Sequence, residues 1–239
     1  LSISSGIFEI APEIASFMHA PTASAIVLGY EWLVGATTVP ALHLAKSFSQ
    51  VEEIRIGALV DEEDTGGPAV AADFEHLNHL LPAALTLREG IWLWREGDDA
   101  KTVFSALDGT EIHAAGFSSI DVTGLAAATG ARSVQFDLGQ GVSSSRRKGG
   151  ALSTEILLDI SGLDHAGQAL HTRHAVVHPG GAAPLTGMGI ALLLERLIGL
   201  DGMPPVASGL YFPWQILDAS RYLARLAQEG GEVLELPSS

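Results

Sequence analysis

The chain has 239 residues, 47% of them hydrophobic, and no cysteine, so it can bury a sizeable core in one large domain. The missing cysteines exclude disulfides, thiolate metal sites and thiol nucleophiles, and they favour an intracellular protein. The formal net charge of −15 excludes long-range attraction to nucleic acids and anionic membranes, since both need a dense positive surface. We therefore expect a cytoplasmic protein that binds neither nucleic acid nor a membrane.

The first third of the chain alternates helical and extended patterns. Apolar spacing predicts a helix over residues 7–18, a helix over 39–48 and a strand over 51–60, and residues 23–32 form an apolar run. An amphipathic pattern over 68–81 predicts a further helix.

Hairpin patterns dominate the middle of the chain. Residues 84–88 and 91–95 alternate around Glu89-Gly90, and residues 101–107 and 110–117 flank the turn Asp108-Gly109. A helix over 122–129 should end at Gly130 as a left-handed cap, and a strand over 132–138 follows it.

The stretch 152–199 combines strong core signals with positive charge. Two strand-like runs flank the polar loop 162–167, and an almost wholly apolar helix follows the break at residues 178–181. Further on, the patterns predict an extended segment over 209–213, a helix over 214–228 and a closing strand over 232–236.

The order of these elements indicates the fold class. Hairpins in the middle and helices toward both ends argue for an α+β fold, with a largely antiparallel or mixed sheet covered by helices on one face. Strict alternation of strand and helix is absent, which makes a doubly wound fold improbable. We expect residues 1–239 to form a single domain.

The histidines of the second strand form the pattern His174-Ala-Val-Val-His178. On a helix these two side chains could hold one metal ion, but the surrounding residues favour a strand, where four residues span about 13 Å. His171 should point to the opposite face of that strand. We therefore predict no metal site, with His174 and His178 as candidate proton donors.

The sequence Ser143-Ser-Ser-Arg146-Arg147-Lys148 is the densest cationic run. Arginine offers a bidentate fork for a carboxylate or phosphate, so Arg146 and Arg147, with Arg132 as a weaker candidate, form a hypothetical anion clamp. A solvated surface loop is the alternative interpretation of the same residues.

Two glycine patterns resemble nucleotide-binding loops without meeting the requirements. Both 139–144 and 187–192 lack the third glycine, and neither combines a preceding strand with a helix start. Close helix packing explains Gly187 and Gly189 better. No site for a cofactor phosphate is predicted in this chain.

Three segments resemble the C-terminal substrate and dimerisation domain of the saccharopine dehydrogenase-like family. They are SISSGIFEIAPEIA near the start, DVTGLAAATGARSVQFDLG in the middle, and PLTGMGIALLLERLIGLDGMPPVASGLYFPWQILDASRYLARLAQEGGEV at the end. Ser5 stands where the family often has proline. The motifs give no catalytic residue to carry over, so the candidate residues rest on their chemistry.

The resemblance implies one part of a two-domain oxidoreductase that acts on an amino-acid-like or imine substrate and forms a homodimer. NAD or NADP would bind a separate Rossmann domain and not this chain alone, while this domain would hold a small carboxylate substrate. The alternative is a non-catalytic dimerisation or small-ligand-binding module. A free-standing hydrolase or isomerase is a third possibility.

Overall fold

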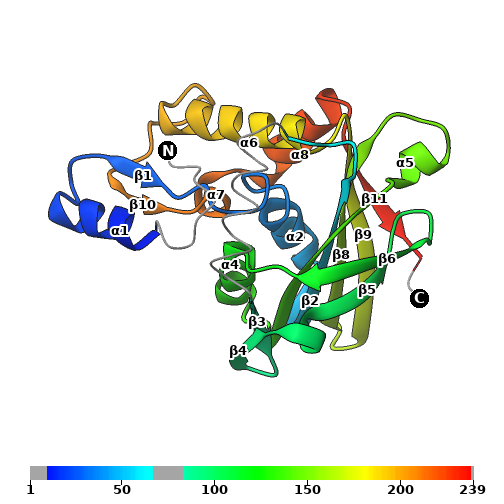
Figure 1. The fold of residues 1–239 in the computed structure, drawn as a ribbon. Helices are drawn as coiled ribbons and strands as arrows, with labels where there is room; N and C mark the ends of the chain where they lie inside the picture. The colour runs from blue at the N-terminus through cyan, green and yellow to red at the C-terminus, as the bar shows by residue number, and fades with distance from the viewer. Residues whose placement is uncertain (1–9, 67–82, 238–239) are drawn as a thin grey trace.

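A mixed sheet of nine strands forms the centre of the molecule (Figure 1). The computed structural model describes residues 10–66 and 83–237. The main sheet contains β2 (Phe48–Asp61), β3 (Ala84–Arg88), β4 (Ile91–Arg95), β5 (Lys101–Ser105), β6 (Glu111–Gly116), β7 (Ser133–Gly141), β8 (Ser153–Asp164), β9 (Ala169–Pro179) and β11 (Glu232–Leu236). The helical elements are α1 (Ile10–His19), α2 (Thr38–Ala45), η2 (Gly97–Ala100), α4 (Ile120–Thr129), α5 (Ser144–Arg147), α6 (Ala182–Leu197), α7 (Pro213–Ile216) and α8 (Ala219–Gln228).

Strand β2 lies in the middle of the sheet. It pairs with β7 in parallel and with β8 antiparallel, and the strand order is β11-β9-β8-β2-β7-β3-β4. The hairpin β5–β6 joins through β6 to the second half of β7. All main-sheet pairings except β2–β7 are antiparallel. The predicted α+β fold with a largely antiparallel sheet is thus confirmed.

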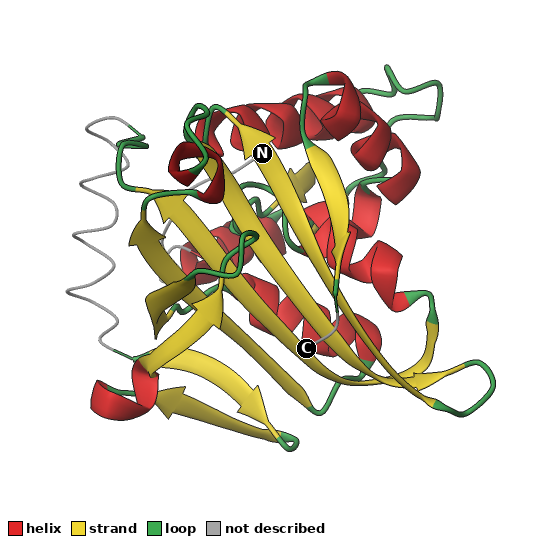
Figure 2. Cartoon of the chain, turned by 90° about the vertical axis from the view of Figure 1, so that its right-hand side faces the viewer, coloured by secondary structure: helices red, strands yellow, loops and turns green. Residues whose placement is uncertain are grey.

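The helices cover one face of this sheet, which Figure 2 shows with the helices behind the strands. Because side chains alternate along a strand, every second residue faces the helix layer. Ile54, Ile56 and Ala58 of β2 belong to the same buried cluster as Leu125 of α4 and Leu192 of α6. The opposite face of the sheet carries the β5–β6 hairpin and the short helix α5 (Figures 1 and 2).

A two-stranded parallel sheet projects from the body (Figure 1). It pairs β1 (Ala25–Val27) with β10 (Gly209–Tyr211), and α1 lies beside it. We call α1, β1 and β10 the arm. The arm packs against α6 through a small apolar cluster that contains Val27 and Leu193.

Most predicted elements are present, with three corrections. The run after residues 139–144, in which no helix was expected, forms the one-turn helix α5 at Ser144–Arg147. The helix expected over 39–48 ends at Ala45, because Phe48 already begins β2. The helix expected over 214–228 is broken into α7 and α8, since Leu217 is extended and the Asp218 carboxylate accepts the Arg221 N–H, which starts a new helix. The helix predicted over 68–81 lies outside the described residues.

The cap and glycine predictions are confirmed in part. Gly130 ends α4 in the left-handed conformation with φ 72°, as expected. A Cβ on Gly189 would lie 2.4 Å from the Val34 carbonyl oxygen, whereas a Cβ on Gly187 would meet no atom of the described residues within 4 Å. Close packing therefore explains Gly189, and the same explanation for Gly187 is wrong.

Candidate functional site

A groove of about 440 Å³ lies on the face of the sheet opposite the helix layer, between strands β2, β7, β8 and β9 and the overhanging strand β5. Figure 2 shows this face toward the viewer. Most of its lining residues are polar or charged: Glu53, Arg55, Thr102, Ser105, Gln135, Asp137, Asp159, Ser161, His171 and Arg173. Carboxylates and guanidinium groups thus face each other across this groove.

Strand register builds the charged row of this groove. Arg173 of β9 lies opposite Asp159 of β8, and Asp159 lies opposite Arg55 of β2. Directly opposed residues of neighbouring strands hold their Cβ atoms about 5 Å apart. The sheet therefore places one carboxylate between two guanidinium groups, in the order Arg173, Asp159, Arg55.

A second row runs parallel to the first. His171 of β9 lies opposite Ser161 of β8, which lies opposite Glu53 of β2. His171 Nε2 lies 3.5 Å from Asp159 Oδ1, so the two rows are joined by this contact. The groove thus holds an imidazole beside its central carboxylate.

The two arginines of the first row are held differently. Arg173 is largely covered: its Nη2 donates to the Ser105 carbonyl at 2.6 Å, and its Nε lies 3.6 Å from Asp159 Oδ1. Arg55 pairs with Glu53 at 2.8 Å, and 60% of its side chain is exposed. Arg55 is therefore the arginine that a dissolved anion can reach.

Asp159 is the central acceptor of the groove. Partial burial raises the pKa of its carboxyl above the ordinary value, and the positive charges of Arg173, His171 and Arg55 oppose that rise. An ammonium group placed beside Asp159 would favour the ionised carboxylate, which burial disfavours. Together with Arg55, Asp159 offers adjacent binding positions for a carboxylate and an ammonium group.

The apolar end of the groove is formed by Phe104 of β5. A Cβ on Gly57 would lie 2.9 Å from the Phe104 ring, so the missing side chain at Gly57 lets β5 approach the sheet. Leu157 lies opposite Gly57 on β8 and also lines the groove. A ligand in the charged part would meet this apolar wall at one side.

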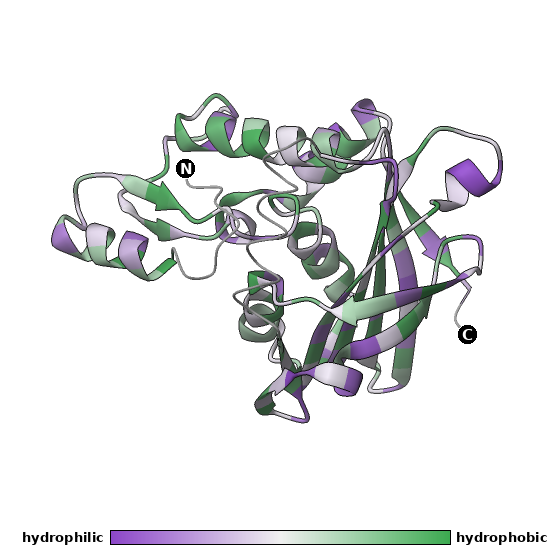
Figure 3. Cartoon of the chain, viewed as in Figure 1, coloured by the Kyte–Doolittle hydropathy of each residue, from purple (hydrophilic) through white to green (hydrophobic). Residues whose placement is uncertain are grey.

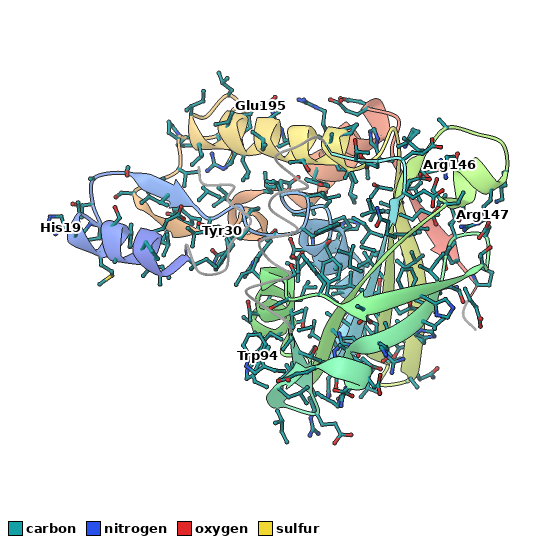
Figure 4. All side chains as sticks on the ribbon, in the orientation of Figure 1. His19, Tyr30, Trp94, Arg146, Arg147 and Glu195 are labelled. Carbon is teal, nitrogen blue, oxygen red and sulfur yellow. The ribbon has the colours of Figure 1, made fainter. Side chains whose placement is uncertain are left out.

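The predicted anion clamp is occupied by the protein's own carboxylates. Arg146 contacts Asp61 at 3.3 Å and Glu62 at 2.7 Å, and it also pairs with Glu63. Arg147 forms a bidentate pair with Asp108, with both N···O distances 2.7 Å. Both arginines sit on α5 at the edge of the sheet (Figure 4).

Arg132 lies elsewhere, directly before β7 and beside the turn of the β3–β4 hairpin. Its guanidinium donates to the Glu89 carbonyl at 3.4 Å, and its side chain is exposed. The three predicted clamp residues are therefore not brought together. Whether any of them binds a substrate stays a prediction.

His174 and His178 share β9 with His171 but face the helix layer, which confirms the predicted strand and the opposite orientation of His171. His178 is 5% exposed and contacts the Glu229 carbonyl through Nε2 at 3.1 Å. Burial lowers the pKa of His174, and Glu235 opposes this shift. Both lie away from the groove, and their role as proton donors stays a prediction.

Sequence reasoning missed Asp159, Arg55 and the grouping of His171 with Arg173. Alternation places residues 171 and 173 on one face of a strand. Their partner Arg55 lies on β2, more than a hundred residues earlier, and their partner Asp159 lies on β8. Only the strand register places these side chains opposite each other. The sequence therefore indicated only that His171 and Arg173 share one face of β9.

No protein-family model matches the sequence, and no curated protein matches it. The fold is similar to the solved structure of apo histidine-tagged saccharopine dehydrogenase (L-Glu forming) from Saccharomyces cerevisiae, with a TM-score of 0.51 and 12% sequence identity. The likeness shows the fold. It covers 86% of this chain and 71% of the yeast chain, and at this identity it assigns no function to any residue.

The described helices include none that is both long and apolar enough to cross a membrane.

Proposed function

We propose that this chain is the substrate-binding and dimerising part of an NAD(P)-dependent oxidoreductase, and that the groove opposite the helix layer holds an amino-acid-like substrate. The alternating row Arg173, Asp159, Arg55 carries the proposal, since an amino acid brings a carboxylate and an ammonium group together. The fold is similar to that of an enzyme named for saccharopine and L-glutamate, which supports the same substrate class.

In this proposal Arg55 binds the substrate carboxylate and Asp159 binds the amine. Arg173 lies two strands from Arg55, about 10 Å at ordinary strand spacing, and can meet a second carboxylate. His171 lies beside Asp159 and is the groove residue suited to exchange a proton with a bound amine. The nicotinamide cofactor would be held by another domain.

Titration calorimetry with L-glutamate tests the groove. Glutarate lacks the ammonium group and 1-aminobutane lacks both carboxylates, so each should bind at least about tenfold more weakly than L-glutamate, because each lost charged hydrogen bond is worth about 1.5–3 kcal/mol. Arg55→Met should weaken glutamate binding by a similar factor.

Arg88→Met is the matched control, since Arg88 is also a strand arginine, 48% exposed and paired with Asp99 at 3.6 Å. Equal loss of binding in both variants would reject the groove, as would binding of glutarate as tight as that of L-glutamate.

The dimerising half of the proposal rests on the edge strand β4. Among the described strands none pairs with its outer side, and Ile91, Trp92 and Trp94 are 66%, 48% and 49% exposed. Trp94 points away from the body in Figure 4. An antiparallel pair of β4 strands centred on Leu93 would place Trp92 beside Trp94 of a second copy.

The two-fold pairing would also bring the turn Glu89-Gly90 opposite the exposed Glu96 of the second copy. Sedimentation should therefore show a dimer that Trp94→Lys dissociates and that Ile198→Lys, on an apolar residue 62% exposed on the other side of the molecule, leaves intact. A monomeric wild-type protein at 100 µM, or a dimer that survives Trp94→Lys, would exclude the β4 interface.

The alternative of a non-catalytic ligand-binding module is compatible with the same groove. It differs in its response to a nicotinamide cofactor. For an oxidoreductase, NADPH fluorescence should change when the complete polypeptide is added and change again with L-glutamate. A module would bind L-glutamate and leave the fluorescence unchanged.

A further inference from the structure

Two carboxylic acids are buried side by side beneath the helix layer. Glu31 is 4% exposed and Asp121 is 0% exposed. The charge of Asp121 raises the cost of charging Glu31, and no lysine, arginine or histidine is among the main causes of either pKa shift. Such a pair is stable when at least one member keeps its proton.

The pair anchors both segments that lead from the arm into the helix layer. In the segment 28–37, which joins β1 to α2, the Trp32 N–H donates to Asp121 Oδ2 at 2.8 Å, and the Thr38 hydroxyl donates to Glu31. In the segment 212–217, which joins β10 to α8, the backbone N–H of Trp214 lies close enough to Glu31 to lower its pKa. Figure 1 shows both segments meeting between the arm and α2.

The first segment is held in an unfavourable backbone conformation. Leu33 and Val34 have φ of 49° and 56°, in the left-handed region that a β-branched residue such as Val34 rarely adopts. The Val34 carbonyl is pressed against Gly189 of α6. The surrounding contacts, including those of the acid pair, must offset this strain, so the segment is poised to change when they weaken.

We propose that Glu31 and Asp121 form a proton-dependent lock, which holds the segments 28–37 and 212–217 against the helix layer and loosens them when both carboxyls lose their protons. The third connection of the arm, residues 198–208, leads to α6 and takes no part in the lock. The arm then remains attached through α6 while its polar anchor opens.

The direction of the pH effect follows from the shifts. Burial is the largest cause for both groups: it raises the pKa of Asp121 from 3.8 to about 6 and that of Glu31 well above 4.5, with the charge of Asp121 as the second cause for Glu31. Hydrogen bonds from Ser119, Thr38 and backbone N–H groups oppose these rises. The folded state therefore holds these protons more tightly than the unfolded chain.

The stabilisation is complete below the ordinary values near pH 4 and is lost as the pH rises through the folded values. Tyr222 of α8 also faces the pair. Its pKa is raised by burial and by the charge of Glu31, so its hydroxyl stays neutral throughout this range. The neighbours from α2 and α7, Thr38 and Trp214, carry no charge. The lock should be closed at pH 5 and should loosen as the pH rises through the folded pKa values of both carboxyls.

Hydrogen exchange measured by mass spectrometry tests the lock. After correction for the intrinsic pH dependence of exchange, protection of residues 28–37 and 212–217 should fall at least about tenfold between pH 5 and pH 8, since one pKa unit corresponds to a factor of ten. Protection of β8 should stay constant. Glu31→Gln keeps the shape and hydrogen bonds without the charge, so its protection should not change with pH.

Asp121→Asn provides a second variant with the same expectation, should Glu31→Gln fail to fold. Asp159→Asn is the matched control: it removes a partly buried carboxyl of raised pKa on the other face of the sheet, and the pH response of the arm segments should persist. A fall in protection that survives in both Glu31→Gln and Asp121→Asn would overturn the proposal, and so would pH-independent protection in the wild-type protein.

Discussion

Arg95 is the residue whose replacement should destabilise this fold most through charge. It is 3% exposed on β4, and its guanidinium donates to Thr86 Oγ1 at 2.9 Å, to the Phe136 carbonyl at 3.2 Å and to Asp137 Oδ1 at 2.8 Å. These bonds tie the β3–β4 hairpin to β7. Arg95→Met would leave the Asp137 carboxylate buried and without its cation.

Breaking a buried ion pair from one side costs about 3–5 kcal/mol. Gln135 Nε2 still donates to Asp137 Oδ2 at 2.9 Å, so we expect the lower end, about 3 kcal/mol, in urea unfolding. Arg95→Met combined with Asp137→Asn should recover more than half of this loss, because no buried charge remains. A cost below about 1 kcal/mol, the range of the exposed Arg88–Asp99 pair, would refute the assignment of a buried charge pair.

Four further substitutions test the packing and caps, each measured by urea unfolding. Gly189→Ala should lower the free energy of unfolding by about 1–3 kcal/mol, because the new methyl group clashes with the Val34 carbonyl. Gly187→Ala has no described atom near the Cβ position and should raise that free energy by up to about 1 kcal/mol. Equal effects would contradict the close contact of α6 with the 28–37 segment. Asp218→Ala should cost about 1 kcal/mol by removing the cap of α8, and no loss would argue for one continuous helix. Tyr222→Phe removes a buried hydroxyl for which the described residues provide no hydrogen-bond partner, so it should be neutral or slightly stabilising; a loss above about 2 kcal/mol would indicate a bound water.

Local sequence signals were sufficient for most of the fold. The turns Glu89-Gly90 and Asp108-Gly109 connect the two predicted hairpins, and the long apolar runs became β2, β8 and α6. Hydropathy drawn on the ribbon shows α6 as largely apolar and α5 as polar (Figure 3), in line with the predicted core helix and cationic loop. These features depend on neighbours within a few residues, which a single sequence displays.

The errors arose where distant residues decide the outcome. The end of α2 depends on Phe48 joining β2, whose partner Asp164 is far along the chain. The break between α7 and α8 is the exception, because its cause is local: the Asp218 side chain accepts from the Arg221 N–H three residues later, although the apolar spacing continues through it. The parallel pairing of β2 with β7 has no local signal.

The candidate site shows the same limit. The cationic run at Arg146 and Arg147 is conspicuous in the sequence, yet nearby acidic residues neutralise it in the fold. Arg55, Asp159 and Arg173 are scattered along the chain and become neighbours only through strand register. The dense cationic run in the sequence therefore corresponds to a network of ion pairs within the fold. The groove could be recognised only once the strand pairing of the sheet was known.

Chemical shift mapping with L-glutamate tests the central claim most directly. Adding the amino acid to the isotope-labelled chain should shift the backbone amides of Arg55, Asp159, His171 and Arg173, with little change at Arg146 and Arg147. Shifts centred on α5 would instead support the anion clamp. The absence of any shift at millimolar L-glutamate would contradict an amino-acid site in this groove.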